Sequence, residues 1–449
     1  MKQNKITIYR GSCQIGGCAT EIQTPGHRIV IDFGANLPDC AAAGTLTDEE
    51  LFQKVFCKKP CDGVLFTHYH NDHVGLYAEI PPEIPLYIGP TAKKILAILT
   101  EKLDAHPSVT HKRLPRLQAM KTYMPARKIS AFGGIQVTPF IVDHSALDAY
   151  MFLIEAAGKR ILFTGDFREH GILGEQNALE KTIRAYIPKV DILITEGTML
   201  SRKSESDKNP IRTEPDLGRR ARQLFQENKV SVLLASSTNL DSIMKFYHAL
   251  PWGMDFVCDA YQAKLILTAI ADKGRYYPKH NLEMIHGKPR RFYIVGNTEG
   301  LGEEQNCYPA DFRILREKGF VLLAREGNPR FRKIMAHFSD PLIICSKWSG
   351  YLWYLDSFEA GVIFWDSKLY QQLVIFHCLL PELSAPPRSA VKPMTQPAPA
   401  WQSGMMRIRA PAKASRFISP RLISRFFSGS LPASGHTDPR CGTPERHLL

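Results

Sequence analysis

The sequence has no long apolar run and no apolar leader. None of its apolar stretches reaches the roughly 18 to 20 residues that a membrane helix needs. The opening, MKQNKITIYRGS, also lacks the apolar core that is typical of a secretory signal. We therefore expect a cytoplasmic protein with no membrane partner. Apolar residues make up 44% of the 449 residues, which is enough for a sizeable core in one or two domains.

The chain also lacks a clustered cysteine framework. Its ten cysteines are scattered, which does not favour a set of disulfides. Only Cys57 and Cys61, in CKKPC, have a spacing that could bind a metal. No second pair lies at zinc-ribbon spacing, so two free thiols in a loop are the better interpretation. Internal repeats are absent as well.

Positive charge is in excess, but it is unevenly placed. The formal net charge is +13, which on its own indicates a polyanionic partner. Residues 384–449 hold ten basic and two acidic residues, or +8 of that total, which leaves +5 for the rest. The case for nucleic acid from charge is therefore weak. Pro, Ser and Arg dominate residues 381–449 without any persistent period, so we expect this basic tail to be disordered.

The pattern of apolar residues changes near residue 200. Before that point short strands separated by Gly and Pro prevail, together with a capping box at Thr47 and a helical stretch at 91–103. From 201 to 345 strands and helices alternate, which predicts an α/β domain with a parallel sheet. We therefore expect one domain over 1–200, a second over 201–345 and a partial return to the first over 346–380.

The segment Thr67–Gly75, THYHNDHVG, carries the densest chemistry. Three imidazoles and one carboxylate, from His68, His70, Asp72 and His73, follow directly on the compact strand at 63–66. Neutral imidazole and carboxylate are the usual ligands of zinc and similar divalent ions. A surface loop that is His-rich by chance does not explain such density beside a buried strand.

This HxHxDH pattern resembles the signature of the metallo-β-lactamase superfamily. The resemblance implies an αββα sandwich with two divalent metal ions, zinc or alternatively manganese. It assigns His68, His70 and His144 to one ion, and it assigns Asp72, His73 and a bridging Asp166 to the other. It gives Asp32 the role of supporting the metal site without binding an ion itself. Taken alone, His144 could be a structural histidine and Asp166 a turn residue.

Further segments resemble the β-CASP group of that superfamily, and ribonuclease J-like proteins in particular. They are the Gly-rich segment at residues 11–17, the segment DILITEGT at residues 191–198, and the segments at residues 232–241 and 343–351. The resemblance implies an inserted α/β domain, a catalytic role for Glu196 and hydrolysis of single-stranded RNA by a metal-activated hydroxide. It also leaves a homodimer open. The hydroxyl and amide groups of Ser236, Ser237 and Asn239 suit a phosphate, although ordinary helix capping explains that loop as well.

The sequence departs from the β-CASP pattern near its end. The group supplies a Ser-Gly-His and a later metal-binding histidine there. His436, in Ser-Gly-His at 434–436, is the only candidate for a catalytic role, and His377 is a remote substitute for the metal ligand. A frameshift after about residue 355 or a truncated relative would explain the difference. Two alternatives to a ribonuclease therefore stay open, namely a hydrolase of a small lactone or thioester and a non-catalytic RNA-binding relative.

Overall fold

The computed structural model describes most of the chain up to residue 346. The described residues are 4–346, apart from gaps at 13, 38–43, 58–59, 108, 110–111, 188, 198–212, 273–290, 326–328 and 339–340, together with the strands Val362–Trp365 and Arg446–His447. The predicted catalytic His436 and most of the tail lie outside the described residues.

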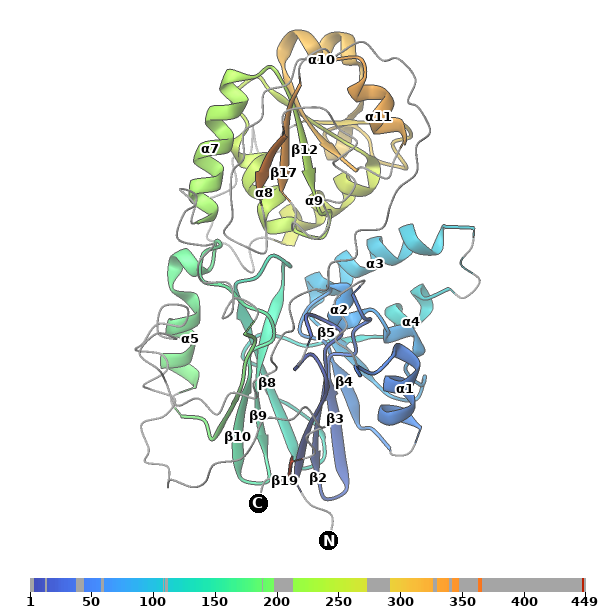
Figure 1. Ribbon diagram of the computed structural model, residues 1–449, viewed down its shortest axis with the longest axis vertical. Coiled ribbons are helices and arrows are strands. Elements are labelled where there is room, and N and C mark those ends of the chain that lie inside the picture. The colour runs from blue at the N-terminus through green and yellow to red at the C-terminus, as the bar shows by residue number, and fades with distance from the viewer. Residues whose placement is uncertain are drawn as a thin grey trace.

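Two sheets face each other in the first domain (Figure 1). One has the order β19-β1-β2-β3-β4-β5-β6, and the other has the order β11-β10-β9-β8-β7. The strands of the first sheet are β1 Lys5–Arg10, β2 Ala19–Thr24, β3 His27–Ile31, β4 Gly63–Leu65, β5 Leu86–Ile88, β6 Lys121–Thr122 and β19 Arg446–His447. Those of the second are β7 Ile129–Phe132, β8 Ile135–Val142, β9 Ala149–Ala156, β10 Lys159–Phe163 and β11 Ile192–Ile194.

Helices cover the outer face of each sheet. The helices α1 Asp48–Phe56, α2 Asn71–Val74, α3 Pro90–Asp104 and α4 Leu114–Gln118 flank the first sheet, and α5 Ala178–Tyr186 flanks the second. Apolar side chains of both sheets, such as Ile29 and Phe152, share one buried cluster between the sheets. On the outer faces Val64 shares a cluster with Leu51 of α1, and Met151 shares one with Ile183 of α5. This is the expected αββα sandwich, built by burying both faces of each sheet.

Two local predictions are confirmed, one by side-chain hydrogen bonds and one by backbone angles. The Thr47 hydroxyl accepts a hydrogen bond from the Glu50 amide, and the Glu50 carboxylate accepts one from the Thr47 amide, so the capping box begins α1. Ala157 and Gly158, with φ of 50° and 71°, form the expected turn between β9 and β10.

The second domain is an α/β unit around a seven-stranded sheet of order β15-β14-β13-β16-β12-β17-β18. All of its paired strands are parallel, as the alternation of strand and helix predicted. The strands are β12 Val230–Ala235, β13 Asp255–Cys258, β14 Phe292–Ile294, β15 Cys307–Pro309, β16 Phe320–Ala324, β17 Leu342–Ser346 and β18 Val362–Trp365. The helices are α7 Glu214–Glu227, α8 Leu240–Ala249, α9 Ala260–Asp272, α10 Phe312–Lys318 and α11 Pro329–Met335.

Most of the segment 346–380, for which a partial return to the first domain was predicted, lies outside the described residues. Its strand Val362–Trp365 pairs with β17 and so belongs to the sheet of the second domain. Near the end of the chain, Arg446–His447 pairs antiparallel with β1 of the first domain.

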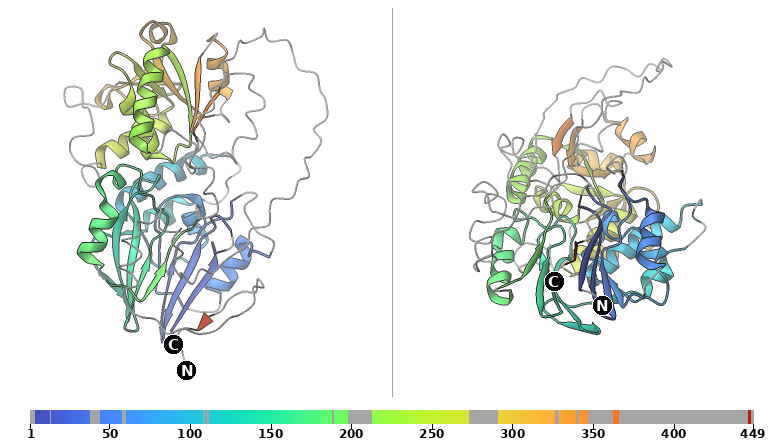
Figure 2. Two further views of the ribbon diagram at one scale, coloured as in Figure 1. Left: turned by 60° about the vertical axis from the view of Figure 1, so that its left-hand side comes forward. Right: turned by 60° about the horizontal axis from the view of Figure 1, so that its bottom comes forward.

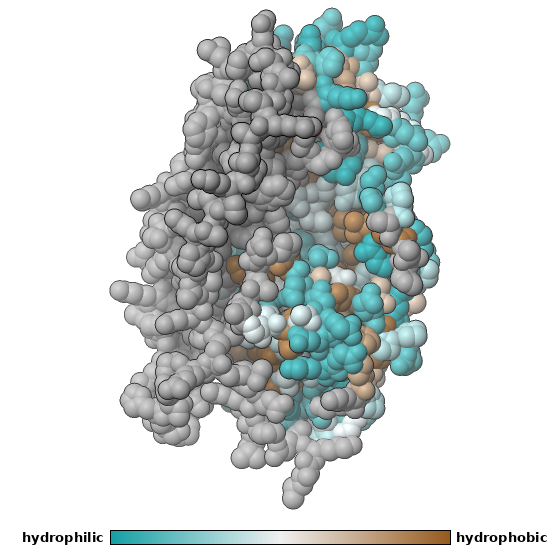
Figure 3. Space-filling view, turned by 45° about the vertical axis from the view of Figure 1, so that its right-hand side comes forward, coloured by the Kyte–Doolittle hydropathy of each residue, from teal (hydrophilic) through white to brown (hydrophobic). Residues whose placement is uncertain are grey.

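The second domain sits on the end of the sandwich at which β4, β8 and β10 end (Figures 1 and 2). The carboxyl ends of its parallel strands face that end, since Tyr69, after β4, donates a hydrogen bond to the Thr238 carbonyl, after β12. On the side of the molecule where α3 lies, the described surface is mostly hydrophilic over both domains (Figure 3). Among the described residues, no helix is long and apolar enough to cross a membrane.

Candidate metal centre

The loop after β4 folds into a tight turn that gathers the predicted ligands. The amides of His73 and Val74 both donate to the His70 carbonyl at 3.0 Å, which starts the short helix α2. The loop is fixed from behind, because the Phe33 amide donates to the His73 carbonyl at 2.8 Å. His68, Asp72 and His73 are buried by this arrangement, while His70 is half-buried.

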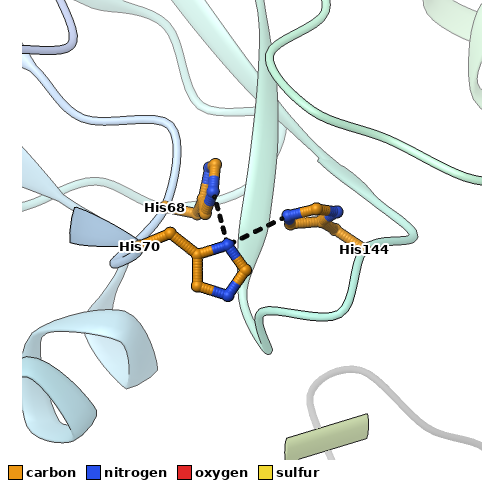
Figure 4. Close-up of side chains that lie close together, drawn as sticks. All are labelled: His68, His70 and His144. Carbon is orange, nitrogen blue, oxygen red and sulfur yellow. Dashed lines mark hydrogen bonds between the residues drawn. The ribbon is translucent and has the colours of Figure 1, made fainter. Parts of the chain in front are cut away.

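Three imidazoles converge as the first donor group. Ring nitrogens of His68, His70 and His144 lie within 4.8 Å of one another. His68 Nε2 lies 3.1 Å from His70 Nδ1, and His144 Nε2 lies 3.3 Å from the same atom (Figure 4). Two ligand atoms of a tetrahedral zinc ion are roughly 3.3 Å apart. The spacing and the donor set therefore fit a divalent ion.

A second donor group lies beside the first and shares His68 with it. Its other members are His73 and Asp166, again with all donor atoms within 4.8 Å. The His73 Nε2 to Asp166 Oδ2 distance is 3.4 Å, and Asp166 Oδ2 also lies 3.9 Å from His144 Nε2. Asp166 thus stands between the two groups. The Asp72 Oδ2 atom lies 3.7 Å from His73 Nε2, at the edge of the second group.

Asp32 holds His73 in its orientation. This fully buried carboxylate lies 2.9 Å from His73 Nδ1, and it accepts hydrogen bonds from the Thr67 amide and hydroxyl. Because Nδ1 is engaged, His73 Nε2 is left facing Asp166. A carboxylate behind a histidine ligand is the usual way in which proteins fix the tautomer and ring orientation at a metal site.

The electrostatic environment of the two groups also fits bound cations. Burial, and then the neighbouring His70, holds the pKa of His144 well below its ordinary value, so its ring is neutral and can act as a ligand. Burial lowers the pKa of His73, but Asp166 and the other acidic groups outweigh it and raise that pKa well above its usual range. The second group is therefore a place where positive charge is favoured.

The segment after Asp166 joins the metal loops to the second domain. The Phe167 amide donates to Glu196 Oε1 at 3.0 Å, so the predicted catalytic acid contacts the backbone next to Asp166. Arg168 is buried and pairs with Asp143, Glu214 and Asp241. The sequence gives no indication of this role of Arg168 apart from its position two residues after Asp166.

The loop at residues 236–239, here called the predicted phosphate loop, belongs to the second domain. It contacts the metal loop, residues 67–75, through Tyr69. The buried Tyr69 hydroxyl donates to the Thr238 carbonyl at 3.0 Å and accepts from the Leu147 amide at 3.0 Å. Asn239 caps α8 by accepting from the Ser242 amide, which is the ordinary role left open for it. The Ser236 hydroxyl lies 2.8 Å from that of Thr238, and Gln262 Nε2 lies 3.5 Å from the Ser237 hydroxyl.

Cys18 is a second residue that the sequence analysis missed at this site. It follows the Gly-rich loop, and its amide donates to the Asp72 carbonyl at 2.8 Å. Burial raises the pKa of this thiol. A thiol directly after a glycine-rich loop was the available signal. Cys57 is exposed and Cys61 is half-buried, and neither forms a disulfide.

Comparison with known families agrees with this geometry. Residues 27–235 match the family described as "Beta-lactamase superfamily domain". This region belongs to the metallo-β-lactamase superfamily, as its sandwich and its histidine pattern indicate.

Its relatives include two proteins named as ribonucleases. Ribonuclease J of Helicobacter pylori is 27% identical over 266 residues, which are 56% of this chain and 35% of that protein. Endoribonuclease YSH1 of Mycosarcoma maydis is 27% identical over 213 residues, which are 44% of this chain and 23% of that protein. The matched region thus spans about a third or less of these relatives.

A solved structure shares the fold across both domains. It is a protein of unknown function from Enterococcus faecalis V583, with a TM-score of 0.61 and 21% sequence identity, and the match covers 81% of this chain and 87% of that one. This likeness supports the sandwich with an additional domain, and it carries no information on activity.

Proposed function

We propose that this chain is a metal-dependent ribonuclease of the β-CASP type that hydrolyses phosphodiester bonds of single-stranded RNA. The observation that carries the proposal is the pair of adjacent donor groups that share His68, with Asp166 of the second group 3.9 Å from His144 of the first. The names of the two relatives supply the choice of RNA, because the donor groups alone would also suit the opening of a lactone or thioester.

Each group of residues has a defined task in this proposal. His68, His70 and His144 hold one divalent ion, zinc or manganese, and His73, Asp72 and Asp166 hold the other, with Asp166 shared. Two such ions, when bound, lower the pKa of a coordinated water and polarise a phosphoryl oxygen. Asp32 keeps His73 in its ligand tautomer, and Glu196 fixes the backbone beside Asp166. The Ser236 and Ser237 hydroxyls lie at the domain boundary, where they can bind a phosphate of the strand.

Metal uptake and RNA cleavage test the proposal together. The purified chain is supplied with zinc or manganese, its metal content is measured, and cleavage of an end-labelled RNA is followed. Asp72→Ala and His73→Ala should each abolish cleavage, while Glu49→Ala, on the exposed side of α1, should leave it unchanged. Cleavage that persists in both site variants contradicts the mechanism.

A non-catalytic RNA-binding protein is a second candidate. One observation favours it. Among the described residues, the second donor group has two imidazoles, and it shares one of them, His68, with the first group, so that only His73 is its own. Such a protein would retain about one ion per chain and bind RNA without cleaving it, whereas the ribonuclease would retain two. Metal stoichiometry measured beside cleavage separates the two candidates.

A further inference from the structure

A cavity lies at the carboxyl edge of the parallel sheet in the second domain. Its volume is about 340 Å³, and it is lined by residues that directly follow β13, β14 and β16, among them Asp259, Val295 and Arg325. The carboxyl ends of parallel strands are where open α/β sheets bind their ligands. None of the metal donors lines this cavity.

The lining of this cavity is basic and draws on both domains. Lys102 comes from α3 of the first domain, Arg325 follows β16, and Arg330 lies on α11. Each of the two acidic groups of the lining has a cationic partner, Arg325 within the lining for Asp259 and Lys264 outside it for Glu299. Asp259 Oδ2 accepts from Arg325 Nε at 2.8 Å, and Glu299 Oε2 lies 3.7 Å from Lys264 Nζ. An anionic ligand is therefore favoured.

Gly296 makes room for one of these cations. A Cβ atom at Gly296 would lie 1.9 Å from Arg330 Nη1, and the residue has a φ of +90°, which other residues rarely adopt. The Arg330 guanidinium can therefore lie directly against the backbone that follows β14. The cation is placed by the local backbone as well as by its own flexible side chain.

The Arg325 guanidinium lies over the ring of Tyr261 in the cavity, and this pair is called the Arg325–Tyr261 platform below. The Arg325 guanidinium carbon lies 5.3 Å from the centre of the Tyr261 ring, and Asp259 holds the guanidinium from the side. Arginine planes and aromatic rings are the surfaces on which proteins stack the unpaired bases of RNA. The cavity thus offers both a surface for a base and cations for a phosphate.

Two hydrogen bonds connect the lining of the cavity with the metal loop. Gln262, the residue after Tyr261, donates from Nε2 to the Ser237 hydroxyl at 3.5 Å, in the predicted phosphate loop. The next residue of that loop, Thr238, accepts a hydrogen bond from Tyr69, which lies between the ligands His68 and His70 in the sequence. One loop and one side chain therefore separate the platform from the first donor group.

We propose that this cavity binds a nucleotide of the same RNA strand whose scissile phosphate lies at the metal centre. The base stacks on the Arg325–Tyr261 platform, and the neighbouring phosphates are held by Lys102 and Arg330. The inference rests on the proposed function for the identity of the ligand. It adds a binding subsite, built from both domains, that lies apart from the metal-binding residues.

Binding of RNA under conditions that prevent cleavage tests the subsite. The full chain is kept metal-free with a chelator, and the anisotropy of a fluorescein-labelled single-stranded RNA is measured over a series of salt concentrations. Lys102→Ala and Arg330→Ala should each weaken binding about tenfold and reduce the slope of log affinity against log salt by about one. Arg313→Ala, which removes an arginine whose side chain is 93% exposed on α10, should change affinity less than twofold.

The conservative variant Arg330→Lys separates a direct phosphate contact from a structural effect. It should restore the salt slope, because it keeps the charge at the same place. If wild-type protein binds RNA and all three alanine variants bind equally well, the subsite is wrong and the proposed function stands. If wild-type protein neither binds nor cleaves RNA, the proposed function fails. Loss of free adenosine monophosphate binding in Arg330→Ala, with RNA binding unchanged, assigns the cavity to a small nucleotide and overturns the inference.

Discussion

The Arg168 guanidinium lies 2.8 Å from the Glu214 carboxylate, and this ion pair crosses the boundary between the two domains. Both side chains are buried, with 8% and 3% of their surface exposed. On the first-domain side Arg168 Nε also lies 2.9 Å from Asp143, the residue before His144. The docking of the second domain is therefore connected to the two loops that carry His144 and Asp166.

Removing the arginine should cost more than removing an ordinary surface charge. Arg168→Ala leaves Asp143, Glu214 and Asp241 buried without their shared cation, and breaking such a buried pair costs about 3 to 5 kcal/mol. Arg168→Lys should lie between this variant and wild type, since one ammonium cannot reproduce the planar fork. Urea unfolding measures both. Arg184→Ala, which breaks an exposed pair with Glu180 on α5, should stay within about 0.5 kcal/mol. An Arg168→Ala variant as stable as this control contradicts the role of the contact.

The same cluster should make stability depend on pH. Burial raises the pKa of Asp143 from 3.8 to about 6, although Arg168 opposes the shift. A group whose pKa is raised on folding stabilises the fold fully below its unfolded value, and that contribution is lost as the pH rises through the folded value. Relative to Asp143→Asn, metal-free wild-type protein should therefore lose stability between about pH 4 and pH 6, by roughly 3 kcal/mol at most. Thermal melts of both proteins across that range measure the difference. A difference that is constant over the range contradicts the expectation.

The sequence predicted the parts of the site whose residues lie close together in the chain. His68, His70, Asp72 and His73 lie within six residues, so their spacing alone indicated a metal site. His144 and Asp166 were assigned through the resemblance to the metallo-β-lactamase superfamily, since each taken alone could be a structural or a turn residue. The capping box at Thr47 likewise involves residues that are neighbours in the chain.

The sequence could not predict contacts that depend on how distant segments pack. Arg168 meets partners 25, 46 and 73 residues away, and no periodicity links those positions. Tyr69 lies between two ligands, yet its hydroxyl turns to Thr238, 169 residues on. The Cys18 amide donates to the Asp72 carbonyl, although the two residues lie in loops that are far apart in the sequence. Tertiary packing sets all three contacts.

Removal of the carboxylate behind His73 should weaken metal binding. In Asp32→Asn the ring of His73 loses its charged partner, and loss of such partners typically costs 10- to 100-fold in metal affinity. Competition with a chromogenic chelator measures the affinity. The matched control is Asp62→Asn, because Asp62 pairs at 3.5 Å with the half-exposed His27 far from the donor groups. Equal metal affinity in the two variants would show that Asp32 does not orient His73.

Removal of the Tyr69 hydroxyl should loosen the contact between the domains. Tyr69→Phe leaves the ring in place but takes away the partner of the Leu147 amide and of the Thr238 carbonyl. An unsatisfied buried polar group costs about 1 to 3 kcal/mol, so unfolding should become easier by that amount. Tyr186→Phe, at a ring that is 57% exposed, should have no measurable effect. Metal content should be unchanged, because His68 and His70 remain. A loss of metal in Tyr69→Phe would place the hydroxyl in the metal site instead.

A single methyl group at Gly34 should damage the second donor group through the backbone. A Cβ atom there would lie 1.7 Å from the Asp72 carbonyl oxygen and 2.6 Å from the His73 amide nitrogen, and neither backbone atom can rotate away. Gly34→Ala must therefore displace the turn that holds Asp72 and His73, at a cost of about 1 to 3 kcal/mol for overpacking. Gly134→Ala is the control, since a Cβ atom there would meet nothing within 4 Å. Metal analysis after dialysis should find the second ion lost before the first in Gly34→Ala and both retained in Gly134→Ala. Retention of both ions in Gly34→Ala would mean that the metal loop is not held against Gly34.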